Sequence, residues 1–264
     1  MDIKNSVALI TGGGKGIGEA VAKHLVRQGA KVAIVDMVQE DIDRVVAEIK
    51  AMGGEAIGVQ ADVSSEADTA RFVQSTVSAF GQLNIAVACA GIIRDGTMLA
   101  LDKTTGKVSR KMGMDKWKPV IDVDLTGTFL TLRDAAEAMV NGGWKGLLVP
   151  ISSVNKIGQI GQLNYSSAKS AVAMMPKIIV GEFLLRGIRN IRCIAIAPGY
   201  TATPMVAGMN QDALQALLKD VHLGRLVEPV EIARLIGHAV ENEAINATTL
   251  EITGGLCYPG GIAK

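Results

Sequence analysis

The chain has few aromatic residues, no surplus of charge and no long apolar run. Aromatic residues make up 3% of its 264 residues, and 27 basic side chains against 26 acidic ones leave a net charge of +1. A nearly neutral chain has no electrostatic footprint for nucleic acid or for an anionic membrane. No apolar run reaches the length that spans a bilayer, and the first residues contain no signal-peptide core. We therefore expect a cytoplasmic protein that acts on a small molecule, with no nucleic acid and no membrane as a partner.

Cysteine is also scarce, which argues against a disulfide framework. Cys89, Cys193 and Cys257 are odd in number and scattered, and none forms a metal-ligand spacing with the three histidines. Reduced, buried cysteines are usual in cytosolic proteins. We expect no metal site.

Short apolar runs alternate with stretches of helical periodicity along the whole chain, without an obvious linker. Strands are expected at 7–10, 32–35, 56–59, 85–88, 147–151, 191–196 and 250–252. Helices are expected at 16–28, 38–52, 66–80, 116–141, 163–186 and 228–242. Such alternation is typical of parallel strands joined by right-handed crossovers, with helices on both faces. The sequence predicts an α/β fold: a single doubly wound Rossmann domain, residues 1–264, with a seven-stranded, mostly parallel sheet.

A glycine-rich turn follows the first expected strand. From Thr11 to Gly18 the sequence is TGGGKGIG, and it leads directly into the first expected helix. Glycines in such a turn let a phosphate approach the N–H groups at the helix N-terminus. A merely flexible turn is the alternative, which the flanking strand and helix disfavour. A P-loop is excluded because Lys15 is followed by glycine rather than by serine or threonine.

Asp36 ends the second expected strand, 18 residues after Gly18. A carboxylate at this place accepts hydrogen bonds from an adenosine ribose and repels a 2′-phosphate, which favours NAD over NADP. Lys15 is a counter-argument, because a basic residue in the turn could meet that phosphate. We expect NAD, because the repulsion from the carboxylate outweighs the attraction of a mobile lysine.

Tyr165 and Lys169 are four residues apart on an expected helix, and therefore lie on one face of it. An ammonium beside a phenol favours the phenolate, which predicts a Tyr165 pKa drawn toward neutrality. Such a phenol can act as a general acid or base. Most pairs at this spacing are surface or packing residues, so the weight of this one comes from the glycine-rich turn.

With these motifs in order, the chain resembles the short-chain dehydrogenase/reductase family in its classical form, over nearly its whole length. The glycine-rich turn is similar to the family's TGxxxGxG loop and residues 165–169 to its YxxxK motif. Residues 151–154 resemble the segment with the catalytic serine, and Ser153 matches it better than Ser152. The resemblance implies Ser153, Tyr165 and Lys169 as catalytic residues. It implies contacts with the cofactor from Gly12, Gly14, Lys15, Gly16, Ile17, Gly18, Asp36, Met37, Asp62, Val63, Ala90, Gly91, Tyr165, Lys169, Pro198, Gly199, Thr201 and Thr203.

The chain departs from the family pattern in two places. The family's NNAG stretch reads ACAG at residues 88–91, and the asparagine usual in the fourth helix is Asp124. In the family that asparagine is thought to kink the helix, and its carbonyl holds a water linked to the active lysine. A backbone role tolerates Asp124, which we count among the catalytic residues. Near Lys169 its charge would stabilise the ammonium and offset the field on Tyr165, so we expect a shifted pH optimum.

Two segments interrupt the regular alternation. Residues 94–116 are longer than a typical connection, and a hairpin is expected within them around 103–106. This inserted segment either walls the substrate pocket, or decorates the surface or an oligomer contact. Residues 203–223 resemble the family's substrate lid, although their methionines and leucines also suit core packing.

The resemblance implies an NAD-dependent oxidoreductase that interconverts a secondary alcohol and its ketone by hydride transfer, with Tyr165 as the general acid or base. It also implies a homo-oligomer, with a tetramer favoured, in which the long helices at 116–141 and 163–186 pack across an interface. A 3-oxoacyl thioester reductase is the alternative substrate class. A catalytically impaired cofactor-binding subunit is the other alternative, and only Asp124 supports it. An epimerase or dehydratase is disfavoured, because 264 residues leave little room for a further substrate domain.

Overall fold

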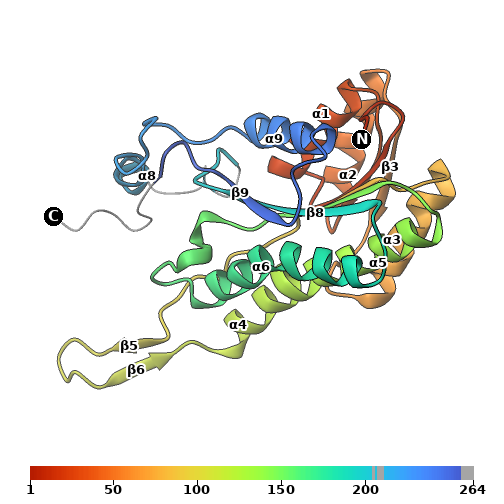
Figure 1. Cartoon of the computed structure of the whole chain (residues 1–264). Coiled ribbons are helices and arrows are strands. Elements are labelled where there is room, and N and C mark those ends of the chain that lie inside the picture. The colour runs from red at the N-terminus through yellow and green to blue at the C-terminus, as the bar shows by residue number, and fades with distance from the viewer. Residues whose placement is uncertain (204–205, 207–210, 257–264) are drawn as a thin grey trace.

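The computed structural model describes residues 1–203, 206 and 211–256. Its centre is a seven-stranded sheet in the order β3-β2-β1-β4-β7-β8-β9, in which every pairing is parallel (Figure 1). The strands are β1 (Val7–Thr11), β2 (Lys31–Asp36), β3 (Ala56–Gln60), β4 (Ile85–Ala88), β7 (Gly146–Pro150), β8 (Ile191–Pro198) and β9 (Thr248–Ile252). The predicted sheet is thus confirmed, and its strands are not just mostly but entirely parallel.

Helices cover both faces of the sheet. The α-helices with described bounds are α1 (Gly16–Arg27), α2 (Gln39–Ala51), α3 (Glu66–Phe80), α4 (Met114–Val120), α5 (Thr128–Asn141), α6 (Leu163–Leu185), α8 (Gln211–Leu218) and α9 (Pro229–Glu241). One buried core joins the sheet to α1, α2 and α9, and a second joins the opposite face to α3, α5 and α6. The doubly wound α/β fold is confirmed. Within the described residues, no helix is both long and apolar enough to cross a membrane.

The central strands are buried on both faces, which explains their unbroken apolar sequence. In β1, Ala8 and Ile10 point into the first core and Leu9 into the second, and all three are 0% exposed. The strand order reverses between β1 and β4. In such sheets the carboxyl ends of the strands beside this switch point form the ligand crevice.

The expected helix at 116–141 is divided by a π-helical segment. After α4, residues Ile121–Gly127 form one π-helical run before α5 begins. Asp124 lies inside this run, and its carbonyl accepts a hydrogen bond of 2.8 Å from the Thr128 hydroxyl. A π-helical stretch is a local departure that often marks a functional site.

The inserted segment forms the predicted hairpin. Strands β5 (Leu99–Leu101) and β6 (Val108–Lys111) pair in antiparallel fashion and project away from the body of the protein (Figure 1). The Asp102 carboxylate fixes the turn, because its Oδ1 accepts hydrogen bonds from the N–H groups of Thr104 and Thr105. Gly106 completes the turn with a φ of +67°.

Candidate active site

The glycine-rich turn between β1 and α1 leaves no space for side chains at several positions, among them Gly12 and Gly18. Gly12 has a φ of +63°, and a Cβ atom on it would lie 2.9 Å from the backbone of Ala90. A Cβ atom on Gly18 would lie 2.2 Å from the carbonyl oxygen of Gly12. Ile17 packs inward against the core, and Lys15, the N-cap residue of α1, makes no side-chain capping hydrogen bond. The turn therefore presents uncapped backbone N–H groups, which suit a phosphate.

Asp36 lies at the end of β2, beside this turn. Its Oδ2 accepts a hydrogen bond of 3.0 Å from the N–H of Gly14, and its Oδ1 accepts one of 2.8 Å from the N–H of Met37. A second carboxylate is close, because Asp41 Oδ2 lies 3.7 Å from Lys15 Nζ. The ammonium of Lys15 therefore already faces the carboxylate of Asp41. This weakens the argument that Lys15 is there to bind the 2′-phosphate of NADP.

Arg44 holds the turn from α2. Its Nη2 donates a hydrogen bond of 2.8 Å to the carbonyl of Gly14, and its guanidinium pairs with Glu19 at 2.7 Å and Glu48 at 3.0 Å. The hydrogen bond from Arg44 keeps the pKa of Glu19 below its ordinary value. The sequence analysis missed Arg44 and Asp41. No sequence pattern marked them, because their contacts with the turn form only when α2 packs beside it.

Met37 and Asp62, two of the residues expected to contact the cofactor, line one small cavity of about 280 Å³. It is lined by Met37, Gln60, Ala61, Asp62 and Asp68. Asp62 itself is held by hydrogen bonds of 2.9 and 2.7 Å from the N–H and hydroxyl of Ser64. Val63 is not among the lining residues. It is buried, and a Cβ atom on Gly127 would lie 2.7 Å from it.

The segment after β4 connects the glycine-rich turn to Lys169. Thr11 Oγ1 accepts hydrogen bonds of 3.1 Å from the N–H of Cys89 and 3.3 Å from that of Ala90. A Cβ atom on Gly91 would lie 3.5 Å from Lys169 Nζ. The small residues at 90 and 91 therefore run between the turn and Lys169.

The segment after β8 closes over the turn from the other side. Pro198 ends the strand, and the Thr201 hydroxyl donates a hydrogen bond of 2.9 Å to the carbonyl of Gly199. The Thr203 methyl group lies 3.3 Å from where a Cβ atom on Gly16 would be. This contact brings residues from opposite ends of the chain together at one edge of the sheet.

Ser153, Tyr165 and Lys169 meet at this edge. Lys169 Nζ lies 5.5 Å from the centre of the Tyr165 ring and donates a hydrogen bond of 3.0 Å to the carbonyl of Ile151. The Ser153 side chain lies beside the Tyr165 hydroxyl, where it lowers the pKa of that phenol. Ser152 is engaged elsewhere, because its hydroxyl donates to the carbonyl of Lys169 at 2.7 Å. Of the two adjacent serines, Ser153 is therefore the one that the fold brings to the phenol.

Asp124 completes a buried charged group. Its side chain is 0% exposed, and its Oδ1 accepts a hydrogen bond of 2.8 Å from the N–H of Ile92. Its Oδ2 lies 3.4 Å from Lys169 Nζ and has no hydrogen-bond partner of good geometry. This distance is long for a charge-assisted hydrogen bond, so the contact is an ion pair.

The charges of Asp124 and Lys169 have opposite effects on the pKa of Tyr165. Burial raises the pKa of Tyr165, the Lys169 ammonium lowers it, and Asp124 raises it again, with a net rise. The expectation of a Tyr165 pKa drawn toward neutrality is therefore wrong for this structure. Burial disfavours the charged form of Lys169, but the Asp124 and Tyr165 side chains outweigh it and leave the lysine pKa raised. Burial raises the pKa of Asp124, although Lys169 opposes that rise.

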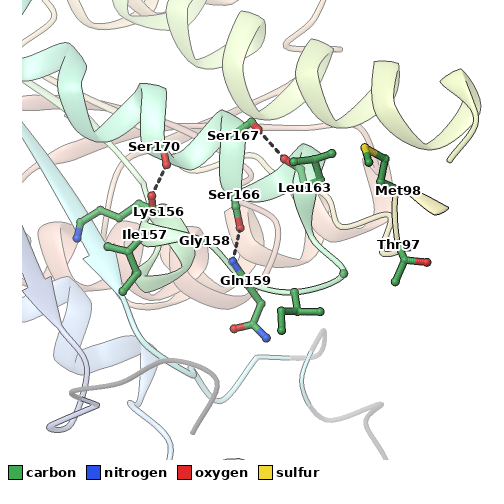
Figure 2. A pocket seen from close by; sticks show the side chains of 13 residues that line it. Thr97, Met98, Lys156, Ile157, Gly158, Gln159, Leu163, Ser166, Ser167 and Ser170 are labelled. Carbon is green, nitrogen blue, oxygen red and sulfur yellow. Dashed lines mark hydrogen bonds between the residues drawn. The ribbon is translucent and has the colours of Figure 1, made fainter. Parts of the chain in front are cut away.

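A cavity of about 540 Å³ lies against the neighbouring face of α6 (Figure 2). It is lined by Gly96, Thr97, Met98, Lys156, Ile157, Gly158, Gln159, Ile160, Gly161, Leu163, Ser166, Ser167 and Ser170. Ser166 follows Tyr165 in the chain, yet neither Tyr165 nor Ser153 lines the cavity. The cavity is therefore a neighbour of the catalytic group and does not enclose it.

Two segments wall this cavity. Thr97 and Met98 belong to the base of the inserted segment, so that base contributes to the wall while β5 and β6 stand away from it (Figures 1 and 2). The second wall, residues 156–161, was missed by the sequence analysis. No local sequence pattern marked it as a wall, and its Ile157 and Ile160 side chains are 66% and 93% exposed.

The expected lid at 203–223 is described only in part. Met205 and Met209 lie outside the described residues, as does Cys257 near the C-terminus. Helix α8 occupies residues 211–218 of this segment, and Leu214 and Leu218 are half-buried. The lid assignment stays a prediction.

The described cysteines, Cys89 and Cys193, form no disulfide. Burial raises the pKa of the Cys89 thiol to about 12 and also raises that of Cys193. In the part of the chain that the structure describes, no cluster of three or more histidine, cysteine, aspartate or glutamate side chains could hold a metal ion.

Comparison with known proteins identifies relatives over nearly the whole chain. The model of the short chain dehydrogenase family matches residues 6–214. The chain is 34% identical to a human (3R)-3-hydroxyacyl-CoA dehydrogenase, over 96% of each chain. It is 35% identical to a 3-oxoacyl-[acyl-carrier-protein] reductase of Synechocystis, over 95% of this chain and 96% of the relative. It is 33% identical to the 2,5-dichloro-2,5-cyclohexadiene-1,4-diol dehydrogenase LinX of Sphingobium indicum, over 96% of each chain.

Proposed function

Because the chain belongs to the short chain dehydrogenase family, we propose that it is an NAD-dependent oxidoreductase that interconverts a secondary alcohol and its ketone. The observation that carries this proposal is the meeting of Ser153, Tyr165 and Lys169 at the edge of the sheet where the glycine-rich turn lies. We also propose that residues 1–264 form one catalytic domain.

The proposed chemistry follows from the hydrogen bonds of these three residues. Ser153 Oγ accepts a hydrogen bond of 3.1 Å from the N–H of Asn155, so its own proton is free to be donated. In the reductive direction the Tyr165 hydroxyl gives its proton to the ketone oxygen, and Ser153 donates a hydrogen bond to the same oxygen as negative charge develops there. In the oxidative direction Tyr165 takes the proton from the alcohol. Lys169 holds a positive charge beside the phenol in both directions.

The chain's residues fit a nicotinamide dinucleotide. When bound, this cofactor supplies the acceptor or donor of the hydride. Gly12 and Gly18 leave room where a Cβ atom would clash with the backbone, and the N-terminus of α1 presents its N–H groups there. Asp36 and Asp41 place two carboxylates beside the turn, which favours a free ribose hydroxyl over a phosphate.

The catalytic assignment is tested with Tyr165→Phe, which removes only the hydroxyl. We expect a loss of turnover of about 10²–10⁴-fold or more, the usual contribution of a general acid or base. Binding of NADH, followed by the change in its fluorescence, should stay near that of the wild type. Ser167→Ala on the same helix is the matched control, because the Ser167 hydroxyl donates to the Leu163 carbonyl at 2.6 Å and faces the neighbouring cavity. An active Tyr165→Phe enzyme would contradict the assignment, as would loss of cofactor binding together with turnover.

The cofactor preference is tested by comparing kcat/KM for NAD and NADP. We expect the wild type to prefer NAD, and Asp36→Ala to lose NAD efficiency while gaining on NADP. Asp43→Ala, an exposed carboxylate of α2 whose recorded partner is Gln39, is the control and should leave the ratio unchanged. A wild-type preference for NADP would overturn this part of the proposal.

Two substrate classes have support. The names of the human and Synechocystis relatives favour a 3-hydroxyacyl or 3-oxoacyl thioester. The name of the Sphingobium relative favours a cyclic alcohol. A panel of 3-hydroxyacyl thioesters, cyclic diols and simple secondary alcohols, assayed with both dinucleotides, separates the two classes. Turnover with none of them would count against both.

We propose that the protein is a cytoplasmic homo-oligomer, with a tetramer favoured, assembled through α5 and α6. Met174, Ile178 and Leu185 form an apolar stripe on α6 and are 62%, 53% and 84% exposed. Phe129 and Val140 on α5 are 51% and 41% exposed. Apolar surface concentrated on two long helices is typical of a face that packs against another protein. Light scattering on the purified protein tests the oligomeric state directly.

A further inference from the structure

The catalytic group contains a negative charge that cancels the charge of its lysine. Asp124 and Lys169 are 0% and 4% exposed, and Oδ2 and Nζ lie 3.4 Å apart. With both ionised, the pair is neutral, so loss of the Tyr165 proton would leave one net negative charge in a buried place. Without the carboxylate, the same proton loss would convert a buried positive charge into a neutral pair. Burial penalises net charge, so Asp124 decides which state of the phenol is favoured.

The titratable groups that face this phenol are few. Lys169 lies on the same helix, Asp124 lies in the π-helical segment, and Cys89 follows β4. The Cys89 thiol is protonated near neutral pH, because burial raises its pKa to about 12. The charge balance around Tyr165 therefore rests on Asp124 and Lys169 alone, within the described residues.

The two oxygens of Asp124 have different roles. Oδ1 accepts a hydrogen bond from the N–H of Ile92, which any amide or carboxylate oxygen in that place could do. Oδ2 faces Lys169 and has no hydrogen-bond partner of good geometry. A purely structural role needs only the first oxygen. The second oxygen adds charge, and charge acts on the lysine and on the phenol beyond it.

We propose that Asp124 is a positioning residue that keeps Tyr165 protonated near neutral pH, so that the enzyme is poised to reduce ketones there and oxidises alcohols well only at alkaline pH. The direction of the reaction rests on the oxidoreductase function proposed above, whereas the protonation of the phenol does not. In the reductive direction the phenol gives its proton to the substrate oxygen and must recover one from solvent before the next turnover. In the oxidative direction a phenolate must already be present.

The first experiment is a spectrophotometric titration of the tyrosines without substrate or cofactor. The chain has three tyrosines, and subtracting the curve of Tyr165→Phe isolates the signal of Tyr165. We expect Asp124→Asn to release the Tyr165 proton at a pH about one unit lower than the wild type or further, as expected when a like charge is removed from its neighbourhood. Asp134→Asn is the matched control: Asp134 is also buried and is hydrogen-bonded to Thr69 and Arg133, outside the catalytic group. In Asp134→Asn, Tyr165 should lose its proton at the same pH as in the wild type.

The second experiment measures kcat in both directions over the same pH range. In Asp124→Asn, the ratio of kcat for oxidation to kcat for reduction near neutral pH should be higher than in the wild type. It should rise about tenfold for each pH unit by which the release of the Tyr165 proton shifts. Equal titration of Tyr165 in the wild type and Asp124→Asn would overturn the proposal, whatever the activity. If the pH at which Tyr165 loses its proton shifts but the protein has no dehydrogenase activity, the proposed function is wrong and the charge assignment of Asp124 is still supported. If Asp124→Asn does not fold, Asp124→Ser removes the same charge and decides the question by the same titration.

Discussion

Removal of the catalytic lysine should destabilise the protein through the charge that it leaves behind. In Lys169→Met, Asp124 keeps its place at 0% exposure but loses the ammonium that lies 3.4 Å from it. At that separation two unit charges attract by about 5 kcal/mol with an effective dielectric constant of about 20. Breaking a buried pair by removing one partner typically costs about 3–5 kcal/mol. For a protein of this size, that corresponds to a fall in Tm of roughly 10 °C.

The matched variant is Asp124→Asn/Lys169→Met, which removes both charges. It should recover most of the lost stability, because the orphaned carboxylate is gone while the Ile92 N–H keeps an acceptor. Activity should stay absent in both proteins. Thermal unfolding of the wild type, the two single variants and the double variant gives the coupling energy of the pair. If the double variant unfolds at the same temperature as Lys169→Met, or lower, the two charges are not coupled and the reasoning about Asp124 fails.

Three further outcomes follow from the geometry. Gly18→Ala should lower Tm by a few degrees and raise the KM for the dinucleotide, because its Cβ atom would lie 2.2 Å from the Gly12 carbonyl; unchanged values would show that the turn can relax. Glu231→Gln should keep the capping box of α9 but lose the pair with Arg225, with a small fall in Tm near neutral pH because the pair is exposed. Because the hydrogen bond from Arg225 lowers the pKa of Glu231 from 4.5 to about 2, this contribution is present above pH 4.5 and fades as the pH falls toward 2; a difference in Tm that stays constant over that range would contradict the assignment. Ile178→Lys should reduce the oligomeric state seen by light scattering, since it places a charge on an exposed apolar stripe; an unchanged mass would exclude that part of α6 from the interface.

Local patterns were enough to predict the scaffold and most of the candidate site. The apolar run at 7–10 followed by glycines could only be a buried strand that enters a tight turn, and β1 and α1 lie there. The spacing of Tyr165 and Lys169 fixed their common face because helical periodicity is a local property. The hairpin around 103–106 was predicted from its turn residues for the same reason, and β5 and β6 pair there.

Contacts between distant segments could not be predicted this way. Arg44 reaches the carbonyl of Gly14, and Asp41 approaches Lys15, only because α2 packs beside the turn. The cavity wall at 156–161 likewise depends on how that segment lies against the base of the hairpin. The spacing of residues along a chain does not say which segments become neighbours.

The order of apolar runs, glycines and a few polar residues was thus sufficient for the fold, since each strand and helix follows from its own periodicity. The tertiary structure decided in which direction the pKa of Tyr165 is shifted. The sequence showed a lysine one turn from Tyr165 and therefore predicted a lowered Tyr165 pKa. It also predicted that the charge of Asp124 would oppose this effect of the lysine. The tertiary structure buries Asp124 and Lys169, places the carboxylate 3.4 Å from the ammonium, and raises the pKa of Tyr165 instead. The physical reason is that a charge acts through distance and solvent exposure, and both are set by packing rather than by position in the chain.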